Sequence, residues 1–180
     1  MRRDSTIDHI VARCKAADRS ALGELYDALV ARVYRFVYFR VTSREDAEDL
    51  TEQIFVRIFE HIGQFDERGI PFEAWVFRIA RNMIIDFYRE HKVAVVPLEE
   101  ALHVPDPGTS PEEQTVTALQ MEDVRSAIPK LPETYGEIIV LKFIEELDNE
   151  EISRILEKPV SHVRVLQSRA IQKLKEILRV

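Results

Sequence analysis

Apolar residues recur along this chain at intervals of three and four, which is the period of a helix with one buried face. No alternation of apolar and polar residues is sustained over the length of a strand, and the 180 residues include only five glycines. The pattern therefore predicts an all-α protein.

A proline-rich, acidic segment interrupts the helical pattern. Residues 93–123 contain no Lys or Arg, and the stretch "VPDPGTSP" places three prolines and a glycine within eight residues. Such a sequence cannot continue a helix. We expect helical domains at 1–92 and 111–180, joined by an acidic flexible linker over 93–110, with a new helix starting at Pro111. A solvated spacer and a segment that enters a basic channel of a partner both fit this composition.

The bulk composition argues against several classes of protein. A formal net charge of −7 disfavours indiscriminate coating of nucleic acid but allows a local basic face. The single Cys14 cannot form an internal disulfide, so we expect a buried thiol in a cytoplasmic protein. No apolar run approaches the ~20 residues that cross a membrane. The sequence shows no P-loop, nucleophile–base pair or metal-ligand spacing, so we expect no catalysis, cofactor, metal or small-molecule substrate.

Residues 147–174, "LDNEEISRILEKPVSHVRVLQSRAIQKL", have the pattern of two helices joined by a tight turn. Asp148 and Glu151 have the spacing of a capping box, in which each side chain bonds a free backbone N–H at the helix start. Pro159 ends this first helix because it has no N–H to donate. We expect the helix to bury three apolar side chains, namely Ile152, Ile155 and Leu156.

The second helix of this pair is expected to start at a Ser161 cap, with Val160 and Val165 packed against each other across the start. Its apolar stripe consists of Val163, Leu166, Ala170, Leu174 and Ile177. The remaining faces are basic. Cations near the end of the helix would complement the helix dipole, but Arg164 lies near the positive N-terminal end, where an anionic partner explains it better.

Such a pair predicts a helix-turn-helix that places the start of its second helix in the DNA major groove. Arg there can bond a guanine edge, whereas cations further along the helix contact phosphates. The candidate DNA-binding residues are His162, Arg164, Val165, Ser168, Arg169 and Lys173. The preceding segment, "LPETYGEIIVLKFIEE", is expected to form a supporting helix that starts at Pro132.

The N-terminal domain contains an acidic amphipathic helix followed by a basic one. In "SREDAEDLTEQIFVRIFEHIGQF" the acids gather in the first half, where they favour the helix start and also suit a basic partner. Residues 65–71 contain Gly69 and Pro71 and are expected to form a loop. The helix that follows combines arginines with aromatic residues, as in proteins that bind single strands, although Trp75 falls on the apolar stripe and is expected in the core.

The order of these motifs resembles the bacterial sigma factors of the sigma-70 family, in the extracytoplasmic-function (ECF) subgroup. "DAEDLTEQIFVRIF" and "FEAWVFRIARNMIIDFYRE" are similar to region 2 of that family, and the segment from "LPETYGEIIVLKF" to residue 174 is similar to region 4. The resemblance implies two helical domains, called σ2 and σ4. Many members have Gly at the position of Glu157 in the turn.

The resemblance also implies partners and site residues. Core RNA polymerase would bind through its β′ clamp helices and β flap, promoter DNA would be bound at the −10 and −35 elements, and an anti-sigma factor would inhibit the chain. The residues implied for polymerase binding are Asp46, Glu48, Asp49, Glu52 and Gln53. Those implied for the −10 element, including capture of a flipped base, are Phe65, Asp66, Arg68, Arg78, Arg81 and Asn82.

Two other classes remain open at this point. A helix-turn-helix regulator that polymerase does not carry would explain residues 147–174 but not the motifs at 43–92. A helical enzyme would require a catalytic constellation that the sequence does not show.

Overall fold

The computed structural model describes residues 5–66, 69–91 and 121–179, and all regular elements within these ranges are helical. The prediction of an all-α fold is therefore confirmed. The predicted linker and the predicted helix start at Pro111 lie outside the described residues. The elements are α1 (Ser5–Lys15), α2 (Arg19–Tyr38), α3 (Arg44–His61), the short 3-10 helix η1 (Ile62–Gln64), α4 (Phe72–Glu90), α6 (Met121–Ala127), the 3-10 helix η2 (Ile128–Lys130), α7 (Glu133–Ile139), the π-helix η3 (Val140–Ile144), α8 (Asn149–Leu156) and α9 (Val160–Leu178).

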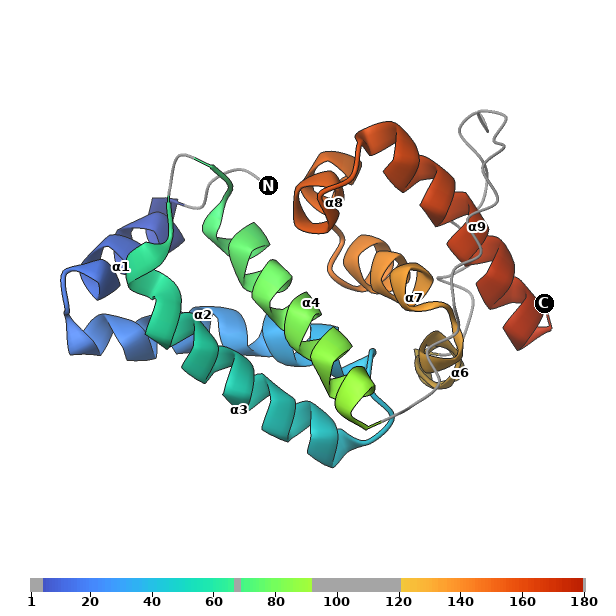
Figure 1. Ribbon diagram of the computed structural model, residues 1–180, viewed down its shortest axis with the longest axis horizontal. Helices are drawn as coiled ribbons and strands as arrows, with labels where there is room; N and C mark the ends of the chain where they lie inside the picture. The colour runs from blue at the N-terminus through green and yellow to red at the C-terminus, as the bar shows by residue number, and fades with distance from the viewer. Residues whose placement is uncertain (1–4, 67–68, 92–120, 180) are drawn as a thin grey trace.

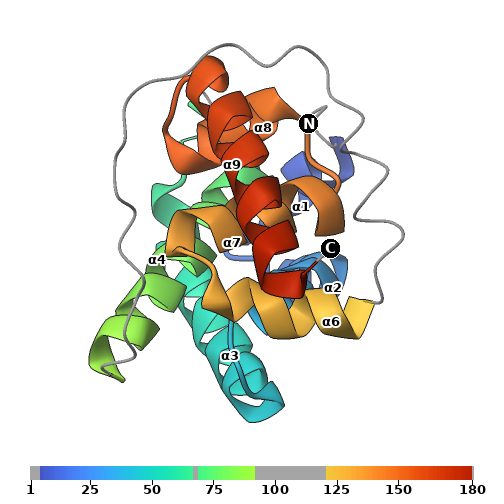
Figure 2. The same ribbon diagram turned by 90° about the vertical axis from the view of Figure 1, so that its right-hand side faces the viewer.

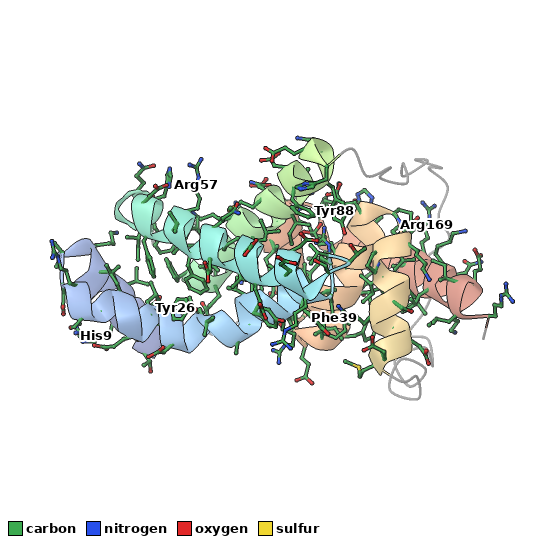
Figure 3. All side chains as sticks on the ribbon, turned by 90° about the horizontal axis from the view of Figure 1, so that it is seen from below. His9, Tyr26, Phe39, Arg57, Tyr88 and Arg169 are labelled. Carbon is green, nitrogen blue, oxygen red and sulfur yellow. The ribbon has the colours of Figure 1, made fainter. Side chains whose placement is uncertain are left out.

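The helices form two lobes that lie side by side (Figure 1). Helices α1–α4 make the N-terminal lobe, and α6–α9 make the C-terminal lobe. The lobes touch where α4 packs against α8 and where α2 packs against η3. Figure 2 shows α9 lying over α7, so that α7 lies between α9 and the N-terminal lobe. The molecule is elongated, with His9 near one end and Arg169 towards the other (Figure 3).

The core of the N-terminal lobe follows the apolar stripes of its helices. On α3, the apolar residues Ala47, Leu50, Ile54, Phe55 and Ile58 are all buried. Ser43 caps this helix by accepting a hydrogen bond from the Asp46 N–H at 2.9 Å. On α4, Phe72, Val76, Phe77, Ala80 and Ile84 are buried, whereas Trp75, which was expected in the core, is only partly buried. The buried face of α4 is wide because both α2 and α3 pack against it.

The predicted supporting helix of the C-terminal lobe begins at Glu133, directly after Pro132, and changes from an α-helix to a π-helix at residue 140. Over Val140–Ile144 the backbone is π-helical, and the Glu145 N–H donates to the Val140 carbonyl at 2.9 Å. Ile138, Ile139 and Leu141 are buried. This wider turn places Glu145 beside α2 of the other lobe, where Arg32 and Arg35 bond it.

Two smaller findings concern the N-terminal part of the chain. The Cys14 thiol is buried, as predicted, and burial raises its pKa. Asp18 caps α2, and its hydrogen bonds from Ser20 and Arg13 hold the pKa of this carboxyl at about 2. None of the described helices is long and apolar enough to span a bilayer.

Candidate functional site

The five residues expected to bind polymerase all lie on the part of α3 that faces away from the core. Glu48, Asp49, Glu52 and Gln53 are exposed, and Asp46 is half-buried. Arg44 donates to Glu48 at 2.8 Å, which is a surface pair one helical turn apart. Val56, on the next turn, leaves 57% of its surface exposed. The surface therefore combines carboxylates with an exposed apolar side chain.

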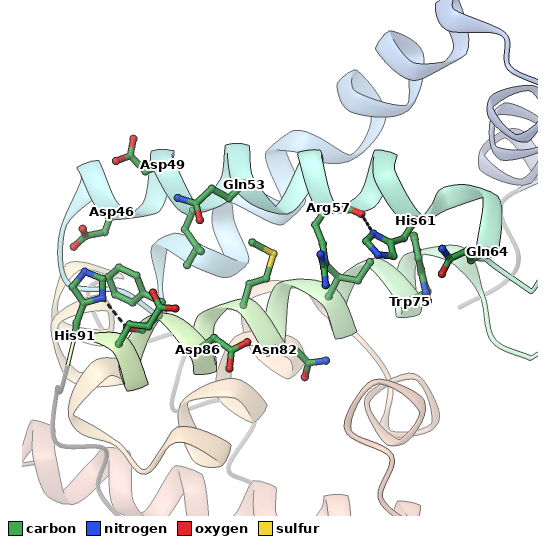
Figure 4. A pocket seen from close by; sticks show the side chains of 15 residues that line it. Asp46, Asp49, Gln53, Arg57, His61, Gln64, Trp75, Asn82, Asp86 and His91 are labelled. Atoms are coloured by element: carbon green, nitrogen blue, oxygen red, sulfur yellow. Dashed lines mark hydrogen bonds between the residues drawn. The ribbon is translucent and has the colours of Figure 1, made fainter.

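A groove of about 810 Å³ runs between α3 and α4 next to this acidic surface (Figure 4). Asp46, Asp49 and Gln53 line it from α3, and Asn82 lines it from α4. His61 Nδ1 lies 2.9 Å from the Arg57 carbonyl oxygen, and His91 Nδ1 lies 2.8 Å from the Phe87 carbonyl oxygen. Each of these hydrogen bonds joins the ring to the backbone one helical turn earlier. The groove thus brings a candidate DNA residue, Asn82, next to candidate polymerase residues.

The residues expected at the −10 element do not form one cluster. The Phe65 ring is 5% exposed and packs against Phe72 and Trp75, with ring centroids 5.0 Å and 5.4 Å away. Phe65 therefore lies in the core rather than on the surface. Asp66 is exposed, and Arg68 lies outside the described residues.

Arg78 and Arg81 lie on a different face of α4 from Asn82 and contact the C-terminal lobe. Arg78 donates through Nε to the Arg154 carbonyl at 2.9 Å and forms an ion pair with Glu157 at 2.8 Å. Arg81 donates through Nε to Glu137 at 3.0 Å. In this form of the chain, the guanidinium groups of both arginines are engaged by the other lobe.

The start of the helix-turn-helix has the predicted capping box. The Glu151 N–H donates to Asp148 at 2.8 Å, and the Asp148 N–H donates to Glu151 at 2.6 Å. Ile152, Ile155 and Leu156 are buried, as predicted. These reciprocal bonds satisfy backbone donors that have no partner within the helix, and they fix where α8 begins.

The turn after α8 is made by a residue in the left-handed conformation. Helix α8 ends at Leu156, before the predicted stop at Pro159, because Glu157 adopts φ 55° and ψ 38°. The Lys158 N–H then bonds the Ser153 carbonyl at 3.2 Å, and the Ser153 hydroxyl donates to the Lys158 carbonyl at 2.6 Å. Glu157 therefore occupies the backbone conformation that glycine adopts most readily at helix ends.

The predicted start of the second helix is wrong by two residues. Helix α9 begins at Val160 with Pro159 at its N-cap, and no side chain caps it. Ser161 is therefore the second helical residue rather than the cap, and Val160 does not precede the cap as the predicted packing with Val165 requires. Proline has a fixed φ that suits a helix start, so this sequence starts a helix without a hydroxyl cap.

The candidate DNA residues of α9 are exposed to different degrees. His162, Arg164 and Lys173 are exposed, whereas Val165, Ser168 and Arg169 are half-buried. Lys173 donates to Glu176 at 2.8 Å, and this bond raises the pKa of the lysine. The opposite stripe is buried as predicted at Val163, Leu166, Ala170 and Leu174, and Ile177 is partly buried.

Two features of the site were not predicted from the sequence. The Gln167 amide donates to the Asn149 side chain at 2.7 Å, which joins the second turn of α9 to the first residue of α8. Glu145 bonds Arg32 and Arg35 across the lobes. The partners are 18 residues apart in the first case and more than 100 apart in the second, so no local spacing indicates them.

Comparison with known proteins identifies both lobes. Residues 25–93 match the model of Sigma-70 region 2, and residues 121–174 match the model of Sigma-70, region 4. The ECF RNA polymerase sigma factor SigW of Bacillus subtilis is 31% identical over 94% of this chain and 95% of its own length. The ECF RNA polymerase sigma factor BldN of Streptomyces coelicolor is 32% identical over 94% of this chain, which spans 64% of BldN.

Solved structures show the same fold. CnrH, determined in complex with the cytosolic domain of CnrY, superposes with a TM-score of 0.70 at 24% identity, over 94% of this chain and 95% of that one. RpoE of Bartonella quintana, determined with the anti-sigma factor NepR, superposes with a TM-score of 0.65 at 21% identity, over 88% of this chain and 96% of that one. With both regions matched in order along most of its length, the chain belongs to the ECF subgroup of the sigma-70 family.

Proposed function

We propose that this sigma factor, which directs core RNA polymerase to promoters, divides the task between its lobes. Helix α3 binds polymerase, the face of α4 with its adjoining loop binds the −10 element, and α9 binds the −35 element. Its action is binding rather than catalysis, and its place of work is the cytoplasm with the polymerase. The observation that supports this division best is the exposed Arg164 at the start of α9.

The −35 contact follows from the charge and exposure of α9. A cation in the first turns of a helix is opposed by the helix dipole, so Arg164 needs a partner from outside the lobe. The helix-turn-helix geometry supplies a DNA base edge or phosphate at that position. Arg169 and Lys173 lie one and two turns further on, where phosphate contacts add affinity without sequence preference.

The polymerase contact follows from the acidic surface of α3. The exposed Asp49, Glu52 and Gln53 stand on a helix whose other face is buried, so they form a rigid surface. Val56 adds exposed apolar area at its edge. Such a surface suits a basic helical partner, and we assign it to the β′ clamp helices.

The −10 contact centres on Asn82 and the 65–71 loop. Asn82 is exposed and lines the α3–α4 groove, where an amide can bond the edge of an unstacked base. Contacts to a flipped base offset the few kcal/mol that unstacking costs. The buried Phe65 supports the loop from below by packing on Phe72 and Trp75.

An anti-sigma factor is proposed as a further partner. Two fold relatives, CnrH and RpoE of Bartonella quintana, were solved with protein partners, and the partner of RpoE is the anti-sigma factor NepR. The α3–α4 groove is open and lined by both polar and apolar side chains, which suits an amphipathic helix of an inhibitor.

Run-off transcription with purified core polymerase on genomic fragments tests the function. The wild-type chain should start RNA at defined sites, and Arg164→Ala should reduce −35-dependent transcription about tenfold or more while leaving core binding unchanged. Arg179→Ala is the matched control, because Arg179 is an exposed cation at the other end of the same helix.

A pull-down without DNA tests the polymerase surface. Asp49→Ala with Glu52→Ala should weaken core binding, whereas Glu60→Gln, an exposed acid at the far end of α3, should not. A chain that bound promoter DNA but not core polymerase would instead be a helix-turn-helix regulator. Equal loss of core binding in Arg164→Ala would contradict the division of labour between the lobes.

A further inference from the structure

Polar contacts join the two helices of the helix-turn-helix at opposite ends of α8. At the turn, the Ser153 hydroxyl donates to the Lys158 carbonyl at 2.6 Å, and the Lys158 N–H donates to the Ser153 carbonyl at 3.2 Å. At the other end, the Gln167 amide donates to Oδ1 of Asn149 at 2.7 Å. Asn149 is the first residue of α8, and Gln167 lies in the second turn of α9.

The separation of these two sets of contacts determines what they can fix. From Asn149 to Leu156, α8 is ~10 Å long at ~1.5 Å per residue. Contacts at the turn alone would leave α9 free to pivot about the turn, whereas a further contact at the far end of α8 fixes the angle between the helices. Figure 1 shows α8 beside the start of α9, so this angle decides how the first turns of α9 are presented.

The buried stripe of α9 does not fix the rotation of this helix about its own axis as sharply. Val163, Leu166 and Ala170 are each at most 2% exposed, and α9 packs against both α7 and α8. Apolar contact is not directional, whereas a hydrogen bond weakens steeply when its angle changes. No side chain caps the start of α9. The bond from Gln167 therefore supplies a directional contact that the apolar stripe lacks.

Asn149 is a well-fixed acceptor for this bond. It directly follows Asp148, and the reciprocal bonds of Asp148 and Glu151, at 2.8 Å and 2.6 Å, order the first turn of α8. Asn149 and Gln167 are both half-buried, so their bond is partly shielded from water. The capping box of α8 thus determines where the second turn of α9 is held.

Gln167 lies at the edge between the buried and the exposed faces of α9. Val163 and Ile171, four residues before and after it, are buried, whereas Arg164, three residues before it, is exposed. Residues three and four apart are neighbours on a helix surface. A contact that fixes the rotation of α9 at Gln167 therefore also fixes the direction in which Arg164 points.

The direction of Arg164 matters because base recognition has a narrow geometry. A rotation of α9 by ~20° moves an atom ~6 Å from the helix axis by ~2 Å. Hydrogen-bond lengths vary by only about 0.5 Å, so such a rotation removes a bidentate contact to a base edge. A phosphate contact requires no such alignment with a particular base. Loss of the Asn149–Gln167 bond should therefore reduce discrimination between bases more than it reduces overall DNA affinity.

We propose that Asn149 and Gln167 are positioning residues for promoter recognition, because their bond sets the orientation of α9 on α8 and so directs Arg164 towards the bases of the −35 element. The role of Arg164 in this proposal rests on the proposed function, whereas the bond itself rests on the contacts above. The pair acts through Arg164 and touches no base.

Run-off transcription with core polymerase measures the effect on a cognate promoter and on copies with single-base substitutions in the −35 element. Gln167→Ala and Asn149→Ala should each lower the cognate-to-substituted ratio about threefold to tenfold, at the base position where Arg164→Ala lowers it. Asn149→Asp should keep the wild-type ratio, since a carboxylate still accepts a bond from the Gln167 amide. The matched control is Gln172→Ala, which truncates an exposed glutamine of the same helix.

Combination with Arg164→Ala shows whether the pair acts through this arginine. In the Arg164→Ala background, Gln167→Ala should lower the ratio no further, because the side chain that it directs is already absent. If Gln167 contacted a base itself, Asn149→Ala would keep the ratio while Gln167→Ala lowered it, and the proposal would be wrong. Unchanged ratios in both alanine variants would also overturn it.

Urea unfolding of the full chain, without polymerase or DNA, tests the bond by itself. A cycle of Asn149→Ala, Gln167→Ala and the double variant should give a coupling of about twofold to tenfold in the equilibrium constant for unfolding. Absence of coupling would overturn the proposal whatever the transcription results. A wild-type chain without any −35 preference would refute the proposed function and the role of the pair with it. Normal wild-type preference with unchanged ratios in both alanine variants would refute the role of the pair alone.

Discussion

Replacement of Glu157 by glycine should stabilise the C-terminal lobe, although it removes an ion pair. Glu157 has φ 55°, a conformation that costs an L-residue roughly 1–2 kcal/mol and glycine almost nothing. Glycine also gives the unfolded chain more conformational freedom, which cancels about 0.4–1 kcal/mol of this backbone gain. The expected net gain from the backbone is therefore about 0.5–1 kcal/mol.

The ion pair with Arg78 must be separated from this backbone effect. Glu157→Gln removes the charge but keeps the left-handed residue, and the exposed pair itself is worth only about 0–1 kcal/mol. Comparison of Glu157→Gly with Glu157→Gln thus isolates the backbone contribution. In a lobe of this size, about 0.5–1 kcal/mol corresponds to about 2–8 °C in Tm.

Thermal unfolding followed by circular dichroism at several urea concentrations measures the difference. Glu157→Gly should unfold at a higher temperature than Glu157→Gln. If the glycine variant unfolds at the same or a lower temperature, the left-handed turn is not strained and the reasoning fails. The wild type should fall between the two variants or close to the glutamine variant.

Two further predictions concern the cap of α8 and the protonation of Glu137. Asp148→Ala should lower the free energy of unfolding of the C-terminal lobe by about 1 kcal/mol in urea titrations. Asp148→Asn should retain most of the wild-type stability, because asparagine still caps the helix. Equal losses in the two variants would refute the capping argument. Burial raises the pKa of Glu137 in the folded chain, against the opposing effect of Arg40 and Arg81. The folded chain therefore binds this proton more tightly than the unfolded chain, so the resulting stabilisation is full below the ordinary pKa of glutamate and is lost as pH rises through the raised value. The free energy of unfolding in urea should fall between pH 5 and pH 8 more in the wild type than in Glu137→Gln, and identical pH profiles would contradict the assignment.

Local sequence signals predicted those parts of the fold that depend on neighbours in the chain. The capping box of Asp148 and Glu151 needs only residues three apart, and the apolar stripe of α9 follows from a single helical period. The acids of α3 are exposed for the same reason, since their spacing places them opposite the buried stripe. The family resemblance added what these signals lack, namely the order of the two regions and their partners.

Competition between local signals explains the errors at helix ends. Ser161 is a good cap, but Pro159 already has the backbone conformation of an N-cap residue, so α9 starts two residues earlier. Glu157 ends α8 before Pro159 because the turn needs a left-handed residue, whatever its side chain. The π-helical turn at 140–144 has no local signature that distinguishes it from an α-helix.

The interlobe contacts could not be predicted because they join distant segments. Arg78 and Arg81 have the spacing of cations on a nucleic-acid-binding helix, and the sequence gives no sign that Glu157 and Glu137 occupy them. Glu145 is one of several acids near residue 146, and only its enclosure by Arg32 and Arg35 distinguishes it. Such pairings depend on how the lobes dock rather than on any repeat.

The buried position of Cys14 limits how this transcription factor responds to oxidants. Peroxides and disulfides attack the thiolate, and enclosure keeps this sulfur in its protonated, unreactive state at neutral pH. The single cysteine of the chain therefore gives the folded protein no exposed, readily ionised thiol for an oxidant to attack.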